Sequence, residues 1–224
     1  MGRSTRDRPA KAPLSRDAVI AAGMTVLRRA GLDAVTMRAV AAELDTGPAS
    51  LYVYVANREQ LLNEMFDAVA AEVELGPAPD AARWREQLEA LFIRVRDAMD
   101  RHPGIARVPL ANIPTGPGAM RIVDHMLAIL GAAGIDDVSA AWFVDTAFLY
   151  VNAACLETSI YAESGTTEDV VDGIRERFAR VDPAAFPHIS ALTDALFSGE
   201  GDDRFVFGLR LMIEGLRHVK PSAR

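Results

Sequence analysis

The sequence predicts an all-α protein with a small helical domain at the N-terminus and a larger helical domain after it. Apolar residues recur at steps of three and four in the long segments, as on one face of a helix. Half of the 224 residues are apolar, which is enough for a buried core. A Gly-Pro-Ala-Pro-Asp break at 76–80 separates the two groups of helices. We expect a disordered basic tail at 1–13, an N-terminal domain with its connecting helix at 14–75, and a second domain at 80–220.

The N-terminal domain is predicted to open with two helices that polar residues cap. Ser15 precedes the first helix, and Gly31 ends it. Thr36 is placed to accept a backbone N–H at the start of a short second helix. The run Asp45-Thr46-Gly47 ends that helix, and we expect the glycine to take the left-handed conformation that a tight helix–helix turn needs.

A third short helix follows this turn. Pro48 is a favourable first residue, and the helix is predicted to run to Val55 with Leu51 and Val55 facing inward. Asn57 then caps a fourth helix, and Gln60 has the spacing of a capping box. Three helices within about fifty residues, with a tight turn between the second and the third, describe a helix-turn-helix unit.

The side chains predicted to point outward favour a nucleic-acid contact. Tyr52 and Tyr54 lie on the third helix, Arg38 begins the second, and Arg58 begins the fourth. Phenolic hydroxyl and guanidinium groups are common donors to phosphates and base edges. The alternative is one more helical hairpin in an all-helical protein, and the exposed donors count against it.

The motifs of this segment match a known pattern. They are Gly-Leu-Asp at 31–33, Thr-Met-Arg-Ala-Val-Ala at 36–41, Ser-Leu-Tyr-Val-Tyr-Val at 50–55 and Asn-Arg at 57–58. With them, the run 15–66 resembles the DNA-binding domain of the tetracycline-repressor (TetR) family. The resemblance implies a homodimer whose third helices read the major groove of a palindromic operator on double-stranded DNA. The DNA-contacting residues expected from it are Arg38, Thr46, Gly47, Pro48, Ser50, Tyr52, Val53, Tyr54 and Arg58.

The distribution of charge agrees with a DNA-facing N-terminus. The net charge of the chain is −7, which alone would count against a nucleic-acid partner. Residues 1–60, however, carry nine Lys/Arg and six Asp/Glu, whereas the remainder carries 15 and 25. A basic end and an acidic body suit a protein that presents one face to phosphates. The tail cations are expected to lie along the DNA or to be merely solvated: Arg3, Arg6, Arg8 and Lys11.

The second domain is predicted as a bundle of helices. Residues 84–99 form one apolar stripe, and a loop rich in proline and glycine at 109–118 leads to a helix at 120–133. From 140 to 161 the chain is apolar nearly all round, which predicts burial on every side.

The last helix predicts a contact with a second copy. Its apolar residues recur in alternating steps of four and three, a seam that suits a partner helix. Together with the apolar helix at 140–161 this gives two spare apolar faces, so we expect a symmetric homodimer through a four-helix interface, and packing inside one chain is the alternative. The residues of the seam are Phe205, Leu209, Met212, Leu216 and Val219.

The second domain also resembles a regulatory domain, that of the tetracycline-repressor branch of the family, through segments such as 127–134 and 207–216. Where that branch has two metal-linked histidines, this chain has Pro109 and Leu149, so a magnesium–tetracycline chelate is not expected. What remains is a cavity suited to a small hydrophobic or aromatic effector, with no metal and no cofactor. The cavity residues that the resemblance implies are Leu91, Val95, Pro109, Ile113, Met126, Leu149, Asn152 and Glu157, of which Asn152 and Glu157 are polar anchors.

Other classes of function find little support. The four histidines are far apart, and the chain has no nucleophile elbow, P-loop or dinucleotide fingerprint. A single cysteine, Cys155, excludes an internal disulfide, and the apolar, uncharged run 146–156 is short of the about 20 residues that span a bilayer. No signal peptide is visible, so we expect a cytoplasmic regulator that is not an enzyme. The alternative is a helical ligand-binding protein or enzyme with a vestigial helix-turn-helix.

Overall fold

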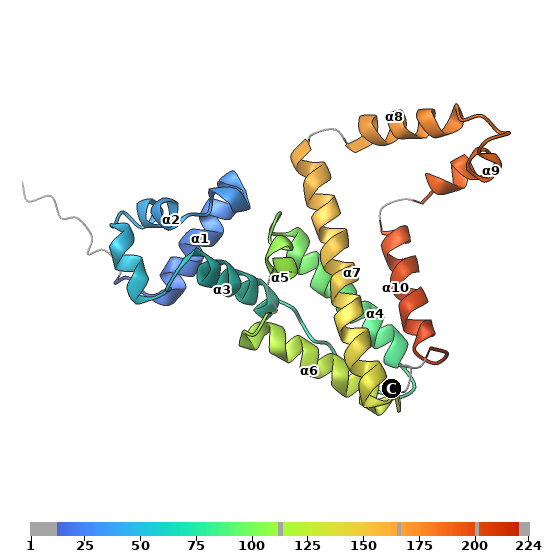
Figure 1. Ribbon diagram of the computed structural model, residues 1–224. Coiled ribbons are helices and arrows are strands. Elements are labelled where there is room, and N and C mark those ends of the chain that lie inside the picture. The colour runs from blue at the N-terminus through green and yellow to red at the C-terminus, as the bar shows by residue number, and fades with distance from the viewer. Residues whose placement is uncertain (1–12, 112–113, 165–166, 200–201, 220–224) are drawn as a thin grey trace, which may run out of the picture. The chain divides into compact units, whose positions relative to one another are not determined.

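The structure is a computed structural model that describes residues 13–111, 114–164, 167–199 and 202–219, and every element in these ranges is a helix. The chain divides into two compact units, 1–65 and 66–224 (Figure 1). The basic tail falls outside the described residues. In chain order the helices are α1 Arg16–Ala30, η1 Leu32–Ala34, α2 Met37–Glu43, η2 Pro48–Val53, α3 Arg58–Ala71, α4 Trp84–Asp100, α5 Arg107–Ala111, α6 Pro117–Ala132, α7 Asp137–Ser164, α8 Thr167–Ala179, α9 Pro187–Leu196 and α10 Asp203–Gly215.

The predicted helix boundaries of the N-terminal unit are confirmed by their caps. The Ser15 hydroxyl accepts the Ala18 N–H at 3.1 Å, and the Thr36 hydroxyl accepts the Ala39 N–H at 3.1 Å. Gly31 ends α1 with φ 78°, a conformation that residues with a Cβ rarely adopt. These interactions satisfy N–H groups that have no partner inside the helix.

The tight turn between α2 and η2 differs from the prediction in one residue. Asp45, not Gly47, takes the left-handed conformation, with φ 47°, whereas Gly47 is extended at φ −81° and ψ 146°. Aspartate tolerates this region because its side chain is short and polar. The Thr46 N–H closes the turn on the Ala41 carbonyl at 2.9 Å. Gly47 instead precedes the first residue of η2.

The third helix is a 3₁₀ helix that ends at Val53, two residues before the predicted end. Its predicted inward residues are confirmed, since Leu51 and Val55 are buried. The capping box of α3 is present with one change. The Gln60 N–H donates to Asn57 Oδ1 at 2.8 Å, and Gln60 Oε1 accepts the N–H of Ala56 instead of that of Asn57.

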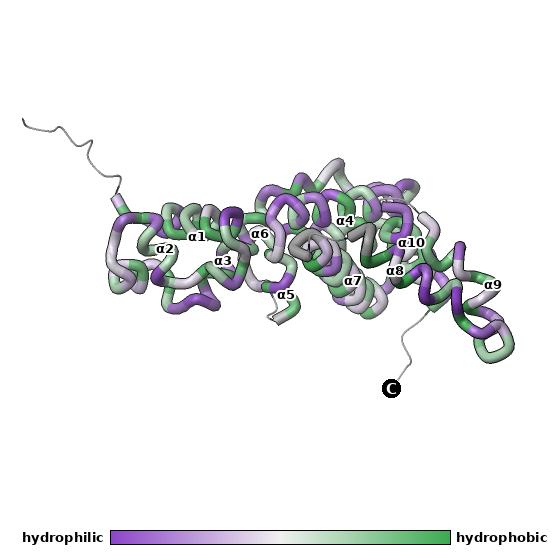
Figure 2. Tube along the Cα trace, turned by 90° about the horizontal axis from the view of Figure 1, so that it is seen from above, coloured by the Kyte–Doolittle hydropathy of each residue, from purple (hydrophilic) through white to green (hydrophobic). Residues whose placement is uncertain are grey.

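In the second unit, α7 is the central helix, and α4, α5, α6 and α10 pack against it (Figure 1). Phe92 of α4 meets Phe143 and Phe148 of α7 edge to face, with ring centroids 6.1 and 6.0 Å apart. By length and composition, residues 137–161 would suffice to cross a membrane. The core helix of a folded domain passes the same test, and the packing of four helices against α7 favours that interpretation. Figure 2 shows polar residues interspersed with apolar ones along the helices around it.

Most of the seam predicted on the last helix packs inside the chain, since Phe205, Leu209 and Leu216 are buried, whereas Val219 exposes 71% of its area. Phe205 of α10 stacks on Tyr150 of α7 with centroids 5.5 Å apart, and Leu209 is fully buried. Arg210 adds two hydrogen bonds of 2.7 Å to Glu89 of α4 and holds the pKa of that carboxyl below its usual value. Apolar spacing alone does not distinguish a partner helix of the same chain from one of another chain.

Helices α8 and α9 form an arm that extends from the end of α7 (Figure 1). They pack on each other, and the Phe178 and Phe197 rings meet edge to face at 5.3 Å. Within α9 only Thr193 is buried.

The end of α3 and the start of α6 lie in close contact. A Cβ added to Gly118 would collide with the Asp67 carbonyl and come within 3.0 Å of the Ala71 nitrogen. Asp67 Oδ1 also accepts the Ala119 N–H at 2.9 Å, which caps α6. From α6, Arg121 donates to the Ala71 carbonyl at 2.8 Å. Each of the two helices therefore satisfies backbone groups at the other's end.

We expect Gly118→Ala to destabilise the second unit by about 1–3 kcal/mol, because the added methyl group meets backbone atoms that cannot move aside alone. The measurement is the free energy of unfolding in urea. Gly131→Ala on the same helix is the matched control, since a Cβ there meets nothing within 4 Å. Equal losses of stability in the two variants would contradict the close contact.

Candidate DNA-reading surface and effector cavity

The start of α2 and the helix η2 present an exposed surface on the N-terminal unit. Tyr52 and Val53 expose 54% and 81% of their area, which is unusual for side chains of their size and apolarity. Gly47, Pro48 and Ser50 are exposed close to them in sequence, and Arg38 is exposed on α2. Thr46 is half-buried, and its hydroxyl donates to the Ser50 hydroxyl at 3.4 Å. We name this set, 38, 46–48, 50, 52 and 53, the reader surface.

Arg38 lies on the reader surface, and its guanidinium has no partner among the described residues. Other arginines of the described N-terminal unit have partners: Arg16 binds Glu64, and Arg29 lies 2.8 Å from Glu43. Among the described residues Arg38 makes no hydrogen bond or ion pair. A fully hydrated guanidinium at this place can turn its donors toward a base edge or a phosphate without losing an internal bond.

Two predicted DNA contacts have internal partners instead. The Tyr54 hydroxyl donates to the Leu14 carbonyl at 2.7 Å. Arg58 donates from Nε to the Val35 carbonyl at 2.6 Å and from Nη2 to the Leu32 carbonyl at 3.0 Å. Both side chains are half-buried, and their donors hold the unit together. The DNA contacts of Tyr54 and Arg58 stay a prediction, and the two residues are not counted in the reader surface.

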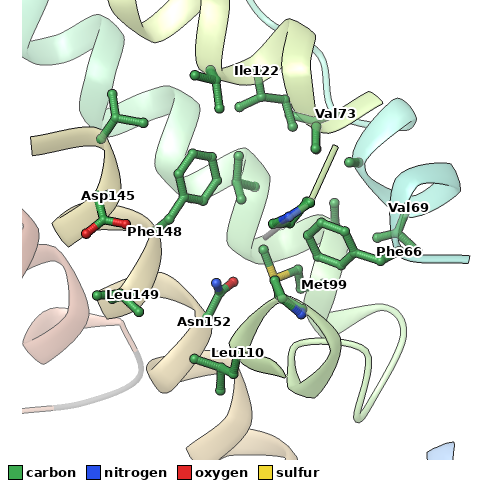
Figure 3. A pocket seen from close by; sticks show the side chains of 18 of the residues that line it. Phe66, Val69, Val73, Met99, Leu110, Ile122, Asp145, Phe148, Leu149 and Asn152 are labelled. Atoms are coloured by element: carbon green, nitrogen blue, oxygen red, sulfur yellow. The ribbon is translucent and has the colours of Figure 1, made fainter. Parts of the chain in front are cut away.

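The second unit contains a cavity of about 440 Å³ between α3, α4, α5, α6 and α7 (Figure 3). Its wall is apolar, apart from two residues on α7, Asp145 and Asn152. Neither Lys, Arg nor His is among the described lining residues. The lining consists of Phe66, Val69, Ala70, Val73, Val95, Ala98, Met99, Pro109, Leu110, Pro114, Ala119, Ile122, Val123, Ala141, Val144, Asp145, Phe148, Leu149 and Asn152.

Four of the predicted cavity residues lie in this lining: Val95, Pro109, Leu149 and Asn152. Leu91 and Met126 are fully buried in the core but do not reach the cavity, and Ile113 lies outside the described residues.

The structure does not support Glu157 as a polar anchor of the cavity, because its side chain is exposed and lies outside the lining. At about 100° per residue, it points about 140° away from Asn152 around α7.

The wall formed by α3 was not predicted. Phe66 and Val69 near its C-terminal end, and Val73 just after it, face the cavity. Their spacing of three and four was visible in the sequence, but the same spacing describes ordinary core packing. Phe148 was missed for another reason, since a helix that is apolar all round does not reveal which face adjoins empty space.

The cavity offers no donor set for a metal or for catalysis. Among the described residues no three His, Cys, Asp or Glu side chains come together in a way that could hold a metal ion. Cys155 is buried on α7, and burial raises the pKa of its thiol, so the thiol stays protonated. What the cavity provides is apolar volume with one amide and one carboxylate.

Comparison with known proteins finds matches for both domains. The profile for bacterial regulatory proteins of the tetR family matches residues 19–65, and that for the tetracyclin repressor-like C-terminal domain matches residues 76–220. The chain is 30% identical to the HTH-type transcriptional repressor DrrR1 of Streptomyces coeruleorubidus, over 98% of this chain and 84% of that protein. It is 27% identical to the class G tetracycline repressor protein of Vibrio anguillarum, over 93% and 96% of the two chains.

A solved structure shares the fold over nearly the whole length. The Streptomyces coelicolor TetR family protein ActR, in complex with actinorhodin, matches with a TM-score of 0.86 and 34% identity, over 92% of this chain and 98% of that one. Both domain profiles and the relatives thus identify the family of the chain. The chain belongs to the TetR family, and it is a ligand-responsive, DNA-binding transcriptional repressor and not an enzyme.

Proposed function

We propose that this protein is a cytoplasmic homodimer that represses from a palindromic operator and is released by a hydrophobic, aromatic small molecule. The main support for this proposal is that α3 connects the N-terminal unit to the cavity wall. The helix begins in the N-terminal unit, where Leu61 and Met65 are buried, and its last turns supply Phe66, Val69 and Ala70 to the cavity wall. A molecule that fills the cavity therefore touches the helix that continues into the reader unit.

The chemistry of the lining supports an aromatic effector. Phe66 and Phe148 offer ring faces or edges, and the remaining wall is almost wholly aliphatic. A cavity of about 440 Å³ is within the usual size range of small-molecule sites. The related ActR has been solved in complex with actinorhodin and with (S)-DNPA, so a relative of the same fold binds small molecules.

On DNA, the reader surface would supply the contacts. Arg38 has the geometry for a bidentate contact with a guanine, while Ser50 and Tyr52 offer hydroxyl groups to phosphates or base edges. The exposed Val53 suits the methyl group of a thymine. A two-fold symmetric dimer would present this surface twice, at about 34–36 Å, which requires a palindrome.

The dimer would use apolar faces that the chain leaves uncovered. On α7, Trp142 and Ile160 expose 59% and 51% of their area, and on α10, Phe207 and Leu211 expose 65% and 59%. The two helices pack on each other, and we propose that these side chains together form one composite face. Two copies of such a face form a four-helix interface. Burying four large apolar side chains per copy is a strong driving force in water.

Release from the operator would follow from the contact between α3 and α6. Ile122 and Val123 of α6 line the cavity together with Val69 of α3. Because Asp67 and Arg121 join the helix ends, a shift of α6 on filling the cavity moves α3 with it. A coupling of about 1–3 kcal/mol would change operator affinity by about 5- to 150-fold.

Arg38→Ala should weaken binding to the operator by about 1–3 kcal/mol and remove much of its sequence preference, because a bidentate base contact is lost. The measurement is fluorescence anisotropy with palindromes from the protein's own promoter region, against scrambled DNA. Arg28→Ala is the control, an exposed arginine that bonds only to Thr25 on its own helix. Normal preference in Arg38→Ala would refute the base contact, and no wild-type binding to any palindrome would favour a ligand-binding protein without operator function.

Val95→Phe should leave operator binding intact and abolish release by a hydroxyanthraquinone, since the added ring occupies the cavity. Leu127→Phe, on the exposed side of α6 and outside the lining, is the matched control and should respond like the wild type. Titration of the preformed operator complex with the anthraquinone measures both. Unchanged release in Val95→Phe would place the effector elsewhere.

Phe207→Arg should convert the dimer to monomers, because a charge then enters the proposed apolar interface. Sedimentation velocity at micromolar protein concentration gives the mass directly. Met120→Arg makes the same change at an exposed position of α6, away from the composite face, and should leave the mass unchanged. A dimeric Phe207→Arg protein would rule out α10 as the contact.

A further inference from the structure

The folded part of the N-terminal unit has no net positive charge of its own. Residues 14–65 contain five arginines, no lysine and six acidic residues, a balance of −1. The basic tail, residues 1–13, contains four cations and one acid, a balance of +3. The positive charge at this end of the protein therefore lies in the tail, whereas the reader surface belongs to a unit that is nearly neutral.

Three of the five arginines of the folded unit are engaged within the protein. Arg16 and Arg29 bind carboxylates, and Arg58 donates to two backbone carbonyls. Among the described residues, Arg28 and Arg38 have no carboxylate or carbonyl partner. A protein that binds DNA gains much of its affinity from cations that neutralise phosphates and release counterions. Two available guanidinium groups per copy supply little of this attraction.

A hydrogen bond between Tyr54 and Leu14 fixes the point at which the tail joins the folded unit. The Tyr54 hydroxyl donates to the Leu14 carbonyl at 2.7 Å, between residues 40 positions apart in the chain. Tyr54 directly follows η2 and its exposed Val53, and Leu14 precedes the Ser15 cap of α1. Both partners are half-buried. The tail therefore starts beside the helix that is proposed to read the major groove.

The length of the tail suits phosphates close to the reader surface. Lys11 is three residues from Leu14, a distance of at most about 10 Å along the chain. Arg3 is eleven residues from Leu14, at most about 36 Å. One turn of DNA is about 34 Å long. A chain held at Leu14 can therefore bring all its cations to phosphates within about one turn of the bases that the reader surface meets.

We propose that residues 3–11 form a second DNA contact, which binds phosphates beside the reader surface, and that Tyr54 is its positioning residue. This rests on the proposed function and adds the source of much of the affinity for DNA. The reader surface selects the base sequence, while the tail supplies an attraction that depends on salt and is the same for any sequence. The cations that make this contact are Arg3, Arg6, Arg8 and Lys11.

The test replaces the four tail cations together by glutamine in the whole chain. Fluorescence anisotropy gives the affinity for an operator palindrome and for scrambled DNA at salt concentrations from about 50 to 200 mM. At the lowest salt we expect both affinities to fall by at least about ten-fold. The slope of log affinity against log salt should decrease by about three to four per copy, because fewer counterions are released. The ratio of the two affinities should stay the same.

The matched control keeps the charge of the tail and changes only its chemistry. Arg3→Lys, Arg6→Lys and Arg8→Lys together should bind with the affinity and the salt slope of the wild type, since a phosphate attracts either cation. Loss of binding in this lysine variant would contradict a purely electrostatic contact.

Tyr54→Phe tests the positioning role, because it removes the hydrogen bond to Leu14 and keeps the ring. We expect it to weaken operator binding about three-fold when the tail is intact, and to cost nothing more when the tail cations are glutamines. An equal loss with either tail would mean that the hydroxyl contacts DNA itself, and would refute the positioning role.

Unchanged affinity and salt slope in the glutamine variant would overturn the tail contact and leave the proposed operator binding standing. Absence of wild-type binding to any palindrome would overturn both.

Discussion

The exchange of caps between α3 and α6 is the interaction on which the sensing half of this molecule depends. The last carbonyls of one helix and the first N–H groups of another have no partners within their own helices. Here Arg121 of α6 donates hydrogen bonds to the last carbonyls of α3, and Asp67 of α3 accepts one from an N–H at the start of α6. The charges also oppose the partial charges of the helix ends that they face. Since the two helices form adjoining walls of the cavity, its shape depends on this pair of contacts.

Local chemistry explains why much of the N-terminal unit could be predicted from the sequence. Ser15, Thr36 and Asn57 each accept the backbone N–H three residues later in the chain. A cap can therefore be predicted wherever such a residue precedes a helical apolar pattern. The turn shows the limit of such reasoning. Either Asp45 or Gly47 can adopt a left-handed conformation, and the choice depends on how the chain must enter η2, which no local preference determines.

What the sequence did not reveal was the choice of partner. The seam of α10 has the spacing of an intermolecular contact, yet Phe205 and Leu209 pack on α4 and α7 of the same chain. Tyr54 and Arg58 look like DNA donors until Leu14 and Val35 are seen to accept their hydrogens. Phe205, Leu209 and Arg58 were placed on the correct helices, and only the tertiary structure decides which neighbour each side chain meets.

The arm of α8 and α9 has a consequence for the dynamics of the chain. Its two helices hold each other mainly through Phe178 and Phe197, and most of its residues are exposed. A segment with so little buried surface opens at a small fraction of the free energy that unfolds the whole unit. Amide hydrogens between residues 167 and 197 would thus exchange with solvent well before those of α7. The protein consequently has a separate local unfolding unit that can open while the cavity remains folded.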